Sequence, residues 1–333
     1  MSEFRVGITA DVLKSDGLPI FGAEVLRLFD EAGIEWEYMN PGSGEVTPAQ
    51  AARYDAVCAM LTRVTAASLA GNDRRLRLIA RFGVGYDTID VPACTRAGVL
   101  LTIAPDGVRR PVATSALTFV LMLAQKVLIK DRLTRTGRWS EKLDHIGTGL
   151  TGRTLGSLGL GNIGAELFRL ARPLEMNFIA HDPAANPSVA AETGVRLVDM
   201  ETLFREADFL TVNCPLNEQT RGLVDARLIG LMKPGAYLIN TARGPIVDER
   251  ALYQALAAGR IAGAGLDVFE EEPTPASNPL LRLDNVILTP HGICFTDECM
   301  RRLAESAFRA ALNVAAGRTP PYLVNPEALD HRT

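Results

Sequence analysis

The feature that most constrains the fold is an alternation of short apolar runs with helical patterns along the whole chain. This alternation is typical of βαβ units, in which a helix joins two parallel strands. The first series of expected strands covers residues 5–10, 35–39, 56–61, 76–81 and 100–103. The second series covers residues 154–158, 177–180, 209–212, 237–240, 263–267 and 286–289. We therefore predict an α/β protein with two parallel-sheet domains.

The helical patterns include 165–172, 248–258 and two longer stretches, 114–129 and 296–316. The stretch 114–129 is the most apolar part of the chain, but it is interrupted by two polar residues and is too short for a membrane span. We expect it to be a buried helix. The final stretch is amphipathic and fits either domain, so the pattern leaves both alternatives open.

A glycine-rich loop follows the strand expected at 154–158 and leads into the helix at 165–172. Gly159, Gly161 and Gly164 have the spacing G-x-G-x-x-G. The first glycine permits a tight turn, the second lets the backbone approach a pyrophosphate, and the third lets the helix pack closely on the strand. The phosphates bind to free amides at the N-terminus of the helix. This order of elements predicts a dinucleotide site.

Asp182 lies 18 residues after Gly164, at the end of the next expected strand. A carboxylate at this place accepts hydrogen bonds from the adenosine ribose and repels a 2'-phosphate. The alternative is a turn residue before Pro183. The order strand, loop, helix and strand favours dinucleotide binding, so NAD rather than NADP is the expected cofactor.

Three groups that can take part in catalysis follow three successive strands of the second series. Arg243 follows the strand at 237–240, the carboxylates of residues 270–272 follow the strand at 263–267, and His291 follows the strand at 286–289. Ligands bind at the C-terminal ends of parallel strands, so we expect these groups to meet at one edge of the sheet. The alternative for each is a solvated loop residue, and for His291 a histidine hydrogen-bonded to backbone.

Several longer motifs occur in a fixed order between residues 76 and 291. They are RFGVGYDTID at 81–90, the glycine loop, CPLNEQT at 214–220, MKPGAYLINTARG at 232–244, LDVF at 266–269 followed by Glu272-Pro273, and Thr289-Pro-His291. With these motifs the chain resembles the D-isomer-specific 2-hydroxyacid dehydrogenases, a family that includes D-3-phosphoglycerate dehydrogenase and glyoxylate/hydroxypyruvate reductase.

The resemblance implies a hydride transfer that interconverts a D-2-hydroxy acid and its 2-oxo acid. Arg243 is expected to bind the substrate carboxylate and the C2 oxygen, His291 to act as acid and base, and Glu272 to orient the His291 ring. The amides of Val84 and Gly85 are expected to hold the carboxylate as well. Asp267 is expected to meet the nicotinamide carboxamide. The full set of expected cofactor-binding residues is Gly159, Gly161, Asn162, Ile163, Gly164, Asp182, Pro215, Thr241, Ala242 and Asp267.

The resemblance also implies how the two domains share the chain. An NAD-binding Rossmann domain of residues 105–291 is expected to be inserted into a flavodoxin-like substrate-binding domain of residues 1–104 and 292–333. The apolar helix that begins near Pro111 is expected to serve in a homodimer.

The chain departs from the family pattern at Thr114, where a glutamate is usual, and at Arg109 and Arg110. Either arginine is a candidate to contact an acidic distal group of the substrate, and the alternative is an ordinary surface arginine. Two other functions stay open: a phosphite dehydrogenase of the same family, which has the same Arg, Glu and His, and an NAD-binding corepressor. Formate dehydrogenases are disfavoured because they carry glutamine at the position of Glu272.

Composition limits the partners and the cellular location. The 35 Lys and Arg residues against 39 Asp and Glu residues give a net charge of -4, so we expect no nucleic-acid or membrane partner. The five cysteines are scattered and indicate neither a disulfide framework nor a metal site. The first residues do not have the pattern of a secretory signal. We therefore expect a cytoplasmic enzyme whose partners are its small-molecule substrate and a second copy of the chain.

Overall fold

The computed structural model describes residues 4–39, 44–71 and 73–331, and the chain divides into two compact units. The discontinuous unit consists of the chain up to Val108 together with the chain from Phe295 onward, and the central unit is Arg109–Cys294. Each unit has one fully parallel sheet, which confirms the prediction of two parallel-sheet α/β domains. The expected boundaries were 104/105 and 291/292.

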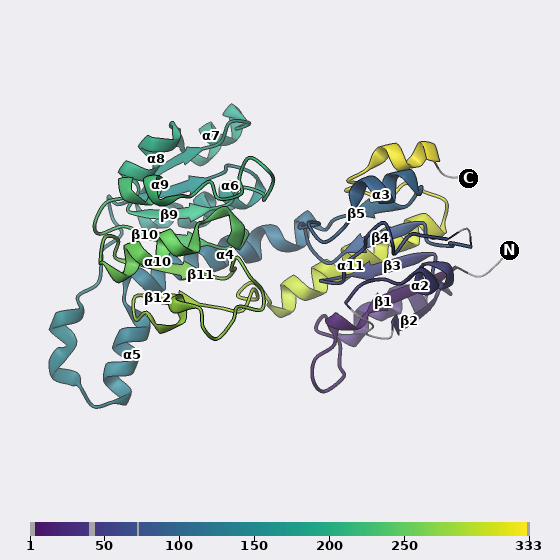
Figure 1. The fold of residues 1–333 in the computed structure, drawn as a ribbon, viewed down its shortest axis with the longest axis horizontal. Coiled ribbons are helices and arrows are strands. Elements are labelled where there is room, and N and C mark those ends of the chain that lie inside the picture. The colour runs from purple at the N-terminus through teal and green to yellow at the C-terminus, as the bar shows by residue number, and fades with distance from the viewer. Residues whose placement is uncertain (1–3, 40–43, 72, 332–333) are drawn as a thin grey trace. The chain divides into compact units, whose positions relative to one another are not determined.

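The discontinuous unit contains a five-stranded sheet in the order β2-β1-β3-β4-β5. Its strands are β1 (Arg5–Thr9), β2 (Glu35–Met39), β3 (Ala56–Ala59), β4 (Leu78–Arg81) and β5 (Leu100–Thr102). Its helices are η1 (Ala10–Val12), η2 (Ala23–Leu26), α1 (Arg27–Asp30), α2 (Pro48–Arg53), α3 (Val91–Arg96), α11 (Asp297–Ala315) and η7 (Pro326–His331). Figure 1 shows these elements with α11 lying along the sheet.

The final helix, α11, belongs to the core of the discontinuous unit. The ring of Phe308 is fully buried and lies 5.4 Å, 4.5 Å and 5.9 Å from the rings of Phe21, Phe29 and Phe82. The sequence pattern left open which domain this helix closes, and this aromatic cluster decides it.

The central unit contains a seven-stranded sheet in the order β12-β11-β10-β9-β6-β7-β8. Its strands are β6 (Thr154–Leu158), β7 (Asn177–His181), β8 (Arg196–Leu197), β9 (Phe209–Val212), β10 (Tyr237–Asn240), β11 (Gly263–Leu266) and β12 (Val286–Leu288). Its helices are α4 (Pro105–Ala124, which begins just before the boundary), α5 (Val127–Arg135), η3 (Trp139–His145), α6 (Asn162–Ala171), η4 (Arg172–Leu174), α7 (Pro187–Thr193), α8 (Met200–Glu206), α9 (Ala226–Leu231), η5 (Gly244–Ile246), α10 (Glu249–Ala257) and η6 (Pro279–Arg282).

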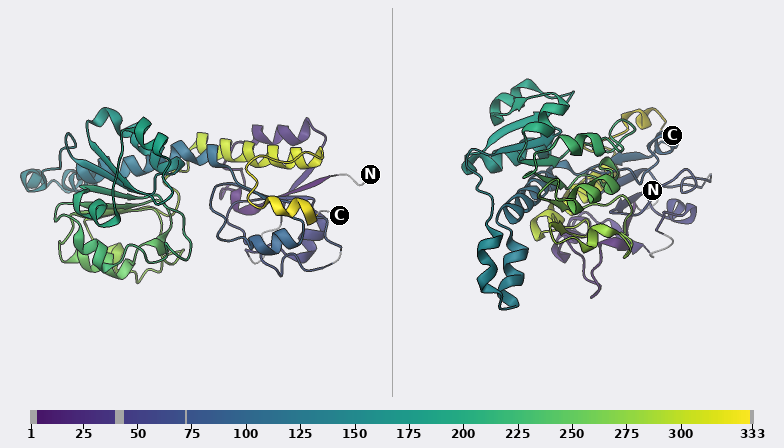
Figure 2. Two further views of the ribbon diagram at one scale, coloured as in Figure 1. Left: turned by 90° about the horizontal axis from the view of Figure 1, so that it is seen from above. Right: turned by 60° about the vertical axis from the view of Figure 1, so that its left-hand side comes forward.

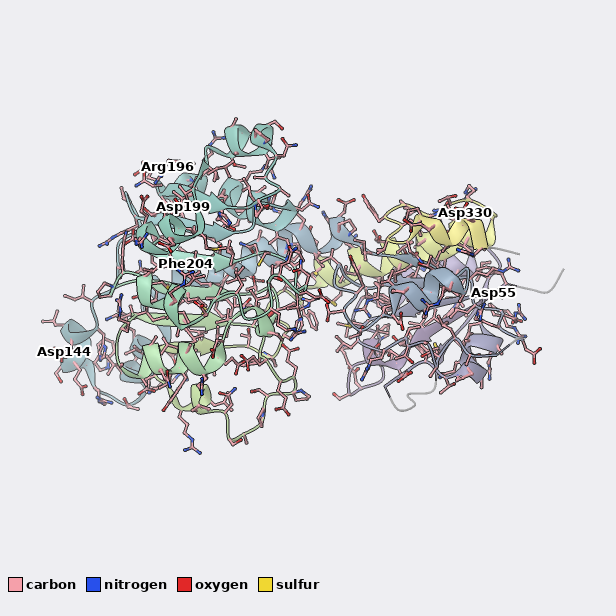
Figure 3. The ribbon with its side chains drawn as sticks, turned by 45° about the horizontal axis from the view of Figure 1, so that its top comes forward. Asp55, Asp144, Arg196, Asp199, Phe204 and Asp330 are labelled. Atoms are coloured by element: carbon pink, nitrogen blue, oxygen red, sulfur yellow. The ribbon has the colours of Figure 1, made fainter. Side chains whose placement is uncertain are left out.

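Helices cover both faces of the central sheet (Figure 2), and each face has its own apolar core. One core contains Phe204 of α8, which is labelled in Figure 3, with side chains of α9 and α10. The other contains Phe119 of α4 and Phe168 of α6. Neighbouring strand residues such as Phe209 and Leu210 belong to opposite cores, because successive side chains point to opposite faces of a strand. The sheet is therefore buried on both faces, and its ligand-accessible positions lie at the ends of its strands.

The expected single helix at 114–129 is wrong, because the chain bends at this place. α4 ends at Ala124, and Lys126 has a left-handed backbone with φ of 51°. The amide of Thr148 donates to the carbonyl of Ala124 at 2.7 Å. This bond satisfies one of the carbonyl groups that have no partner within the helix at its C-terminal end. α4 also begins at Pro105, well before Pro111.

Two further differences concern short or terminal elements. α6 begins at Asn162, three residues before the expected start, so it includes the third glycine of the loop. Strand β8 was not expected, because its two residues are both exposed and leave no apolar run.

No single described helix is long and apolar enough to cross a membrane; α4 and α5 meet that test only as a pair bent by 56°.

Candidate active site

The three expected catalytic groups follow three neighbouring strands of the central sheet. Arg243 follows β10, Glu272 follows β11 and His291 follows β12, and these strands are paired in that order. The strands are parallel, so all three groups start from the same edge of the sheet. The glycine loop after β6 and Asp182 after β7 start from that edge as well.

His291 and Glu272 form a direct pair. Nδ1 of His291 lies 2.7 Å from Oε2 of Glu272, and the two side chains are 37% and 35% exposed. The other carboxylate oxygen of Glu272 accepts a hydrogen bond from the amide of Phe269 at 2.9 Å. A carboxylate accepts at Nδ1 only if that nitrogen carries the proton, so the pair leaves Nε2 as the nitrogen that can exchange a proton with a ligand.

The surroundings of Glu272 lower the pKa of its carboxyl group below the ordinary value of 4.5. Partial burial raises this pKa, but the hydrogen bonds from His291 and from the Phe269 amide lower it, as do the charges of His291 and Arg243. Glu272 is therefore ionised at neutral pH and can stabilise a positive charge on the imidazole.

The backbone around His291 is held in an uncommon conformation. His291 has φ of 51°, which few residues other than glycine adopt. Its amide donates to the carbonyl of Asp267 at 2.7 Å. Oδ1 of Asp267 accepts hydrogen bonds from the Thr289 hydroxyl at 2.6 Å and from the amides of Gly292 and Ile293 at 2.9 and 3.1 Å. Asp267, only 3% exposed, thus anchors the histidine loop.

Asn240 and Gly244 determine the loop that carries Arg243. The buried side chain of Asn240 donates to the carbonyl of Arg243 at 3.0 Å and accepts from the amide of Ala242 at 3.0 Å. A Cβ on Gly244 would lie 1.9 Å from the backbone of Phe269, so only glycine allows this close approach. The loop of Arg243 is in this way packed against the segment that positions Glu272.

The glycine loop has the shape that a dinucleotide phosphate needs. A Cβ on Gly159 would lie 2.9 Å from the backbone of Asn213, and one on Gly164 would lie 2.5 Å from the Gly159 carbonyl. A Cβ on Gly161, in contrast, would meet no atom within 4 Å, so the backbone there borders open space. Among the described residues, no acceptor binds the amides of Asn162, Ile163 and Gly164 at the start of α6. These amides and the helix dipole fit an anion.

A network of hydrogen bonds among Ser157, Thr211 and Asn213 holds the glycine loop from the protein side, and the sequence did not predict it. The side-chain amide of Asn213 donates to Ser157 at 2.8 Å and to Thr211 at 2.9 Å. Ser157 in turn donates to the Gly159 carbonyl at 2.6 Å, and Thr211 donates to the Gly156 carbonyl at 3.0 Å. The only signal in the sequence was a set of small polar residues inside or directly after two apolar strands.

Asp182 lies next to the glycine loop. Its Oδ2 accepts from the amide of Leu160 at 2.8 Å, and its Oδ1 accepts from the amide of Ala184 at 2.8 Å. A carboxylate has about four acceptor positions, so both oxygens can still accept from ribose hydroxyls. The remaining expected cofactor residues, Pro215 after β9 and Thr241 and Ala242 after β10, start from the same edge of the sheet.

Val84 and Gly85 belong to the discontinuous unit, in the loop that follows β4. No acceptor in the described part of the chain binds the amides of Val84, Gly85 and Tyr86. Consecutive free amides in a loop form an anion-binding concavity.

Arg110 has a partner within the central unit. Its Nη1 lies 2.9 Å from Oε1 of Glu166, a side chain of α6 that is 9% exposed. Arg109 and Thr114 are both exposed, and the Thr114 hydroxyl donates to the Arg110 carbonyl at 2.9 Å. The ion pair gives Arg110 a role on the helix that follows the glycine loop, which weakens the hypothesis that it contacts a distal group of the substrate.

The cysteines are all free thiols, and three of them are buried. Burial is the main cause that raises the pKa of Cys214 to about 11 and that of Cys94 to about 12. These two thiols are therefore poor nucleophiles at neutral pH. Within the described ranges, no group of three or more His, Cys, Asp or Glu side chains could hold a metal ion.

Comparisons with known proteins point to one family. Residues 117–292 match the family described as "D-isomer specific 2-hydroxyacid dehydrogenase, NAD binding domain". A glyoxylate reductase of Korarchaeum cryptofilum is 37% identical over 300 residues, which cover 89% of this chain and 90% of that protein. A D-3-phosphoglycerate dehydrogenase of Archaeoglobus fulgidus is 36% identical over 307 residues, which cover 92% of this chain but only 58% of that protein.

Solved structures share the same fold. The crystal structure of a D-lactate dehydrogenase from Aquifex aeolicus, complexed with NAD and lactic acid, has a TM-score of 0.83 and 25% sequence identity. The match covers 96% of this chain and 99% of that chain.

Proposed function

Because this chain belongs to the D-isomer-specific 2-hydroxyacid dehydrogenases, which are NAD(P)-dependent oxidoreductases, we propose that it interconverts a D-2-hydroxy acid and its 2-oxo acid with Arg243, Glu272 and His291 as catalytic residues. The observation that carries this assignment is the 2.7 Å contact between His291 and Glu272. A histidine paired with an ionised carboxylate, at the sheet edge that carries the glycine loop, is suited to proton transfer next to a bound dinucleotide.

Each proposed substrate-binding residue offers donors that suit a carboxylate. The planar guanidinium of Arg243 binds the carboxylate and the C2 oxygen together, because its donors are spaced for two oxygen acceptors. Val84 and Gly85 of the discontinuous unit are proposed as substrate-binding residues as well, because their amides are free to donate to a carboxylate.

His291 exchanges the proton of the C2 oxygen. In the reduction, Nε2 donates a proton to the carbonyl oxygen as that oxygen gains electrons, and in the oxidation Nε2 removes the hydroxyl proton. Glu272 holds the proton on Nδ1 and stabilises the imidazolium that forms during oxidation. The bound nicotinamide supplies the hydride for reduction and accepts it during oxidation. Glu272 and Arg243 keep their charges throughout.

The substrate is a short 2-oxo acid such as glyoxylate or hydroxypyruvate in this proposal. The name of the Korarchaeum cryptofilum relative supports it, because that protein is a glyoxylate reductase and matches nearly the full length of this chain. The ion pair of Arg110 with Glu166 also weakens the case that this arginine binds a second acidic group of the substrate.

NAD is the preferred dinucleotide in this proposal, since Asp182 would repel a 2'-phosphate on the ribose. Asp182→Ala should therefore reduce the ratio of kcat/KM with NADH to kcat/KM with NADPH. The exposed Asp330, which lies in the discontinuous unit, serves as the control, and Asp330→Ala should leave the ratio unchanged. An unaltered ratio in Asp182→Ala would show that this carboxylate does not read the ribose.

The chain acts as a homodimer in this proposal. A projecting segment, residues 127–146 with α5 and η3, extends away from the central sheet (Figures 1 and 2), and Figure 3 labels Asp144 on it. Its side chains Trp139, Leu143 and Ile146 are 64%, 71% and 71% exposed. Apolar side chains exposed together to this extent are typical of protein interfaces. The five free thiols favour a reducing compartment, so we place the enzyme in the cytoplasm.

The assay that tests the reaction follows the oxidation of NADH, and separately of NADPH, with glyoxylate, hydroxypyruvate, phosphohydroxypyruvate, pyruvate, phenylpyruvate and 2-oxoglutarate. We expect turnover with glyoxylate or hydroxypyruvate and a preference for NADH. If none of these acids is reduced although NADH binds, the proposal of a 2-oxo acid reductase is wrong. Phosphite with NAD would then be the next substrate to test.

A further inference from the structure

Arg81 is a buried cation at the C-terminal end of β4, and nothing in the mechanism above uses it. Only 6% of the residue is exposed. Its Nε donates to the carbonyl of Gly85 at 3.1 Å, and its Nη1 lies 3.5 Å from the carbonyl of Ala59 at the end of β3. Burial of a guanidinium is costly unless it is hydrogen-bonded, so a buried arginine at a ligand-binding edge is expected to have a specific role.

The contact with Gly85 lies in the loop that presents free amides. The loop is held at a second point, where the carbonyl of Gly83 accepts from the amide of Ala104 at 2.9 Å. Gly83 has φ of 150°, a conformation that side chains disfavour. In a trans peptide the carbonyl and the following amide point in opposite directions. Since the Gly83 and Gly85 carbonyls point into the protein, the amides of Val84 and Tyr86 point away from these partners.

We propose that Arg81 is a positioning residue for the substrate carboxylate, acting through the loop of residues 82–86. Its guanidinium fixes the peptide planes so that the loop amides stay free to bind an anion. It also polarises the Gly85 carbonyl, which strengthens the amide of Tyr86 as a further anion donor beside those of Val84 and Gly85. This inference rests on the proposed function, because it assigns the loop to the carboxylate of the same substrate.

The test compares Arg81→Met, which keeps length but loses charge and donors, with Arg81→Lys, which keeps the charge and a single donor group. Arg77→Met is the matched control, because Arg77 precedes β4 at its opposite end and its side chain is 54% exposed. We expect the KM for glyoxylate with NADH to rise about tenfold or more in Arg81→Met. A change of this size is typical when a hydrogen bond to a charged group is lost. The KM of Arg81→Lys should be intermediate, and kcat and the Kd for NADH should stay close to wild type.

A merely structural role would give a different result. It would lower the Tm or the fraction of active enzyme and leave the KM of the folded enzyme unchanged, and that outcome would overturn the inference. A fall in kcat with an unchanged KM would overturn it as well. If Arg81→Met does not fold, the KM of Arg81→Lys tests the inference by itself. A wild-type KM in Arg81→Lys would show that the guanidinium is not needed.

Binding of oxalate to the protein–NADH complex, measured by calorimetry, separates this inference from the proposed reaction. If wild type reduces no 2-oxo acid but binds oxalate, and Arg81→Met binds it about tenfold more weakly, the reaction is wrong and the role of Arg81 is supported. If wild type binds no oxalate, or if wild type and Arg81→Met bind it equally, the inference is overturned. Turnover by wild type with an unchanged KM in both Arg81 variants would overturn it and leave the reaction standing.

Discussion

At the residue scale, the hydrogen bonds that position Glu272 beside His291 also keep its carboxylate ionised. Glu272 receives a hydrogen bond from the Phe269 amide and lies within 2.7 Å of the His291 ring. The carboxylate therefore has two donors that favour its ionised form, and its pKa is lowered in spite of partial burial. Near neutral pH the site therefore keeps a negative charge beside the His291 ring, the proposed site of proton transfer.

The proposed proton-transfer role of His291 predicts a large effect of its substitution. In His291→Asn, kcat should fall by about two to four orders of magnitude, the usual contribution of a general acid or base. The Kd for NADH, measured by fluorescence, should stay unchanged. His331→Asn, on an exposed histidine of η7, is the control and should keep full activity. Unchanged turnover in His291→Asn would refute the assignment.

The lowered pKa of Glu272 predicts a pH dependence of stability. The folded protein holds this proton less tightly than the unfolded chain, so the stabilisation is fully present above the ordinary pKa of 4.5 and is lost as pH falls through the lower folded value. The difference in the free energy of unfolding between wild type and Glu272→Gln should be constant near neutral pH and shrink below about pH 4.5. Urea unfolding from about pH 7 to about pH 4 measures it.

Glu271→Gln is the control for this pH dependence, because the Glu271 side chain is exposed beside Glu272. Its stability difference from wild type should show no change over the same range. A difference for Glu272→Gln that grows as the pH falls would contradict the predicted sign.

At the scale of elements, the glycine loop depends on two different uses of glycine. Gly159 and Gly164 are surrounded closely by protein backbone, whereas Gly161 borders open space. Gly159 and Gly164 therefore serve the packing of β6, α6 and the end of β9, whereas Gly161 leaves room for a ligand. The network of Ser157, Thr211 and Asn213 holds the same loop from the protein side.

This difference predicts that Gly161→Ala separates folding from cofactor binding. The added methyl group meets no protein atom, so the Tm should stay close to wild type. The Kd for NADH should rise about tenfold or more, because the methyl group occupies the space where the backbone approaches the pyrophosphate. Gly235→Ala, also in open space but before β10, is the control and should bind NADH normally. Unchanged NADH binding in Gly161→Ala would place the phosphates elsewhere.

At the scale of the whole molecule, the projecting segment carries a group of apolar side chains that a single chain leaves exposed. Its helices α5 and η3 pack on each other, yet Trp139 and Leu143 stay mostly exposed. A second copy of the chain would cover these side chains and bury apolar surface, which is the main driving force of association.

The proposed homodimer predicts an effect of polar substitutions in this segment. The double variant Trp139→Ser and Leu143→Ser should have the molar mass of one chain by light scattering, whereas wild type should have that of two. Leu18→Ser is the control, since Leu18 is 56% exposed but lies in the discontinuous unit, and it should stay dimeric. A wild-type mass of one chain would contradict the proposed dimer.

Much of the molecule follows from the order of residues along the chain. Apolar runs with helices between them predict parallel strands, and parallel strands place their C-terminal ends at one edge. For this reason the loops of Arg243, Glu272, His291 and the glycines could be assigned to one edge of a sheet without coordinates. The close spacing of the glycines also predicts the phosphate loop, because its geometry is local.

Other features depend on contacts between residues far apart in the sequence. The aromatic cluster of Phe308 decides which unit α11 completes, and the left-handed Lys126 divides the expected long helix. The roles of Asn213 under the glycine loop and of Asp267 in the histidine loop were hidden for the same reason. Local patterns determined which elements form and which loops share one edge of the central sheet. Only the tertiary structure decided which buried polar groups hold the loops, because a hydrogen bond requires two partners at about 3 Å, whatever their separation along the chain.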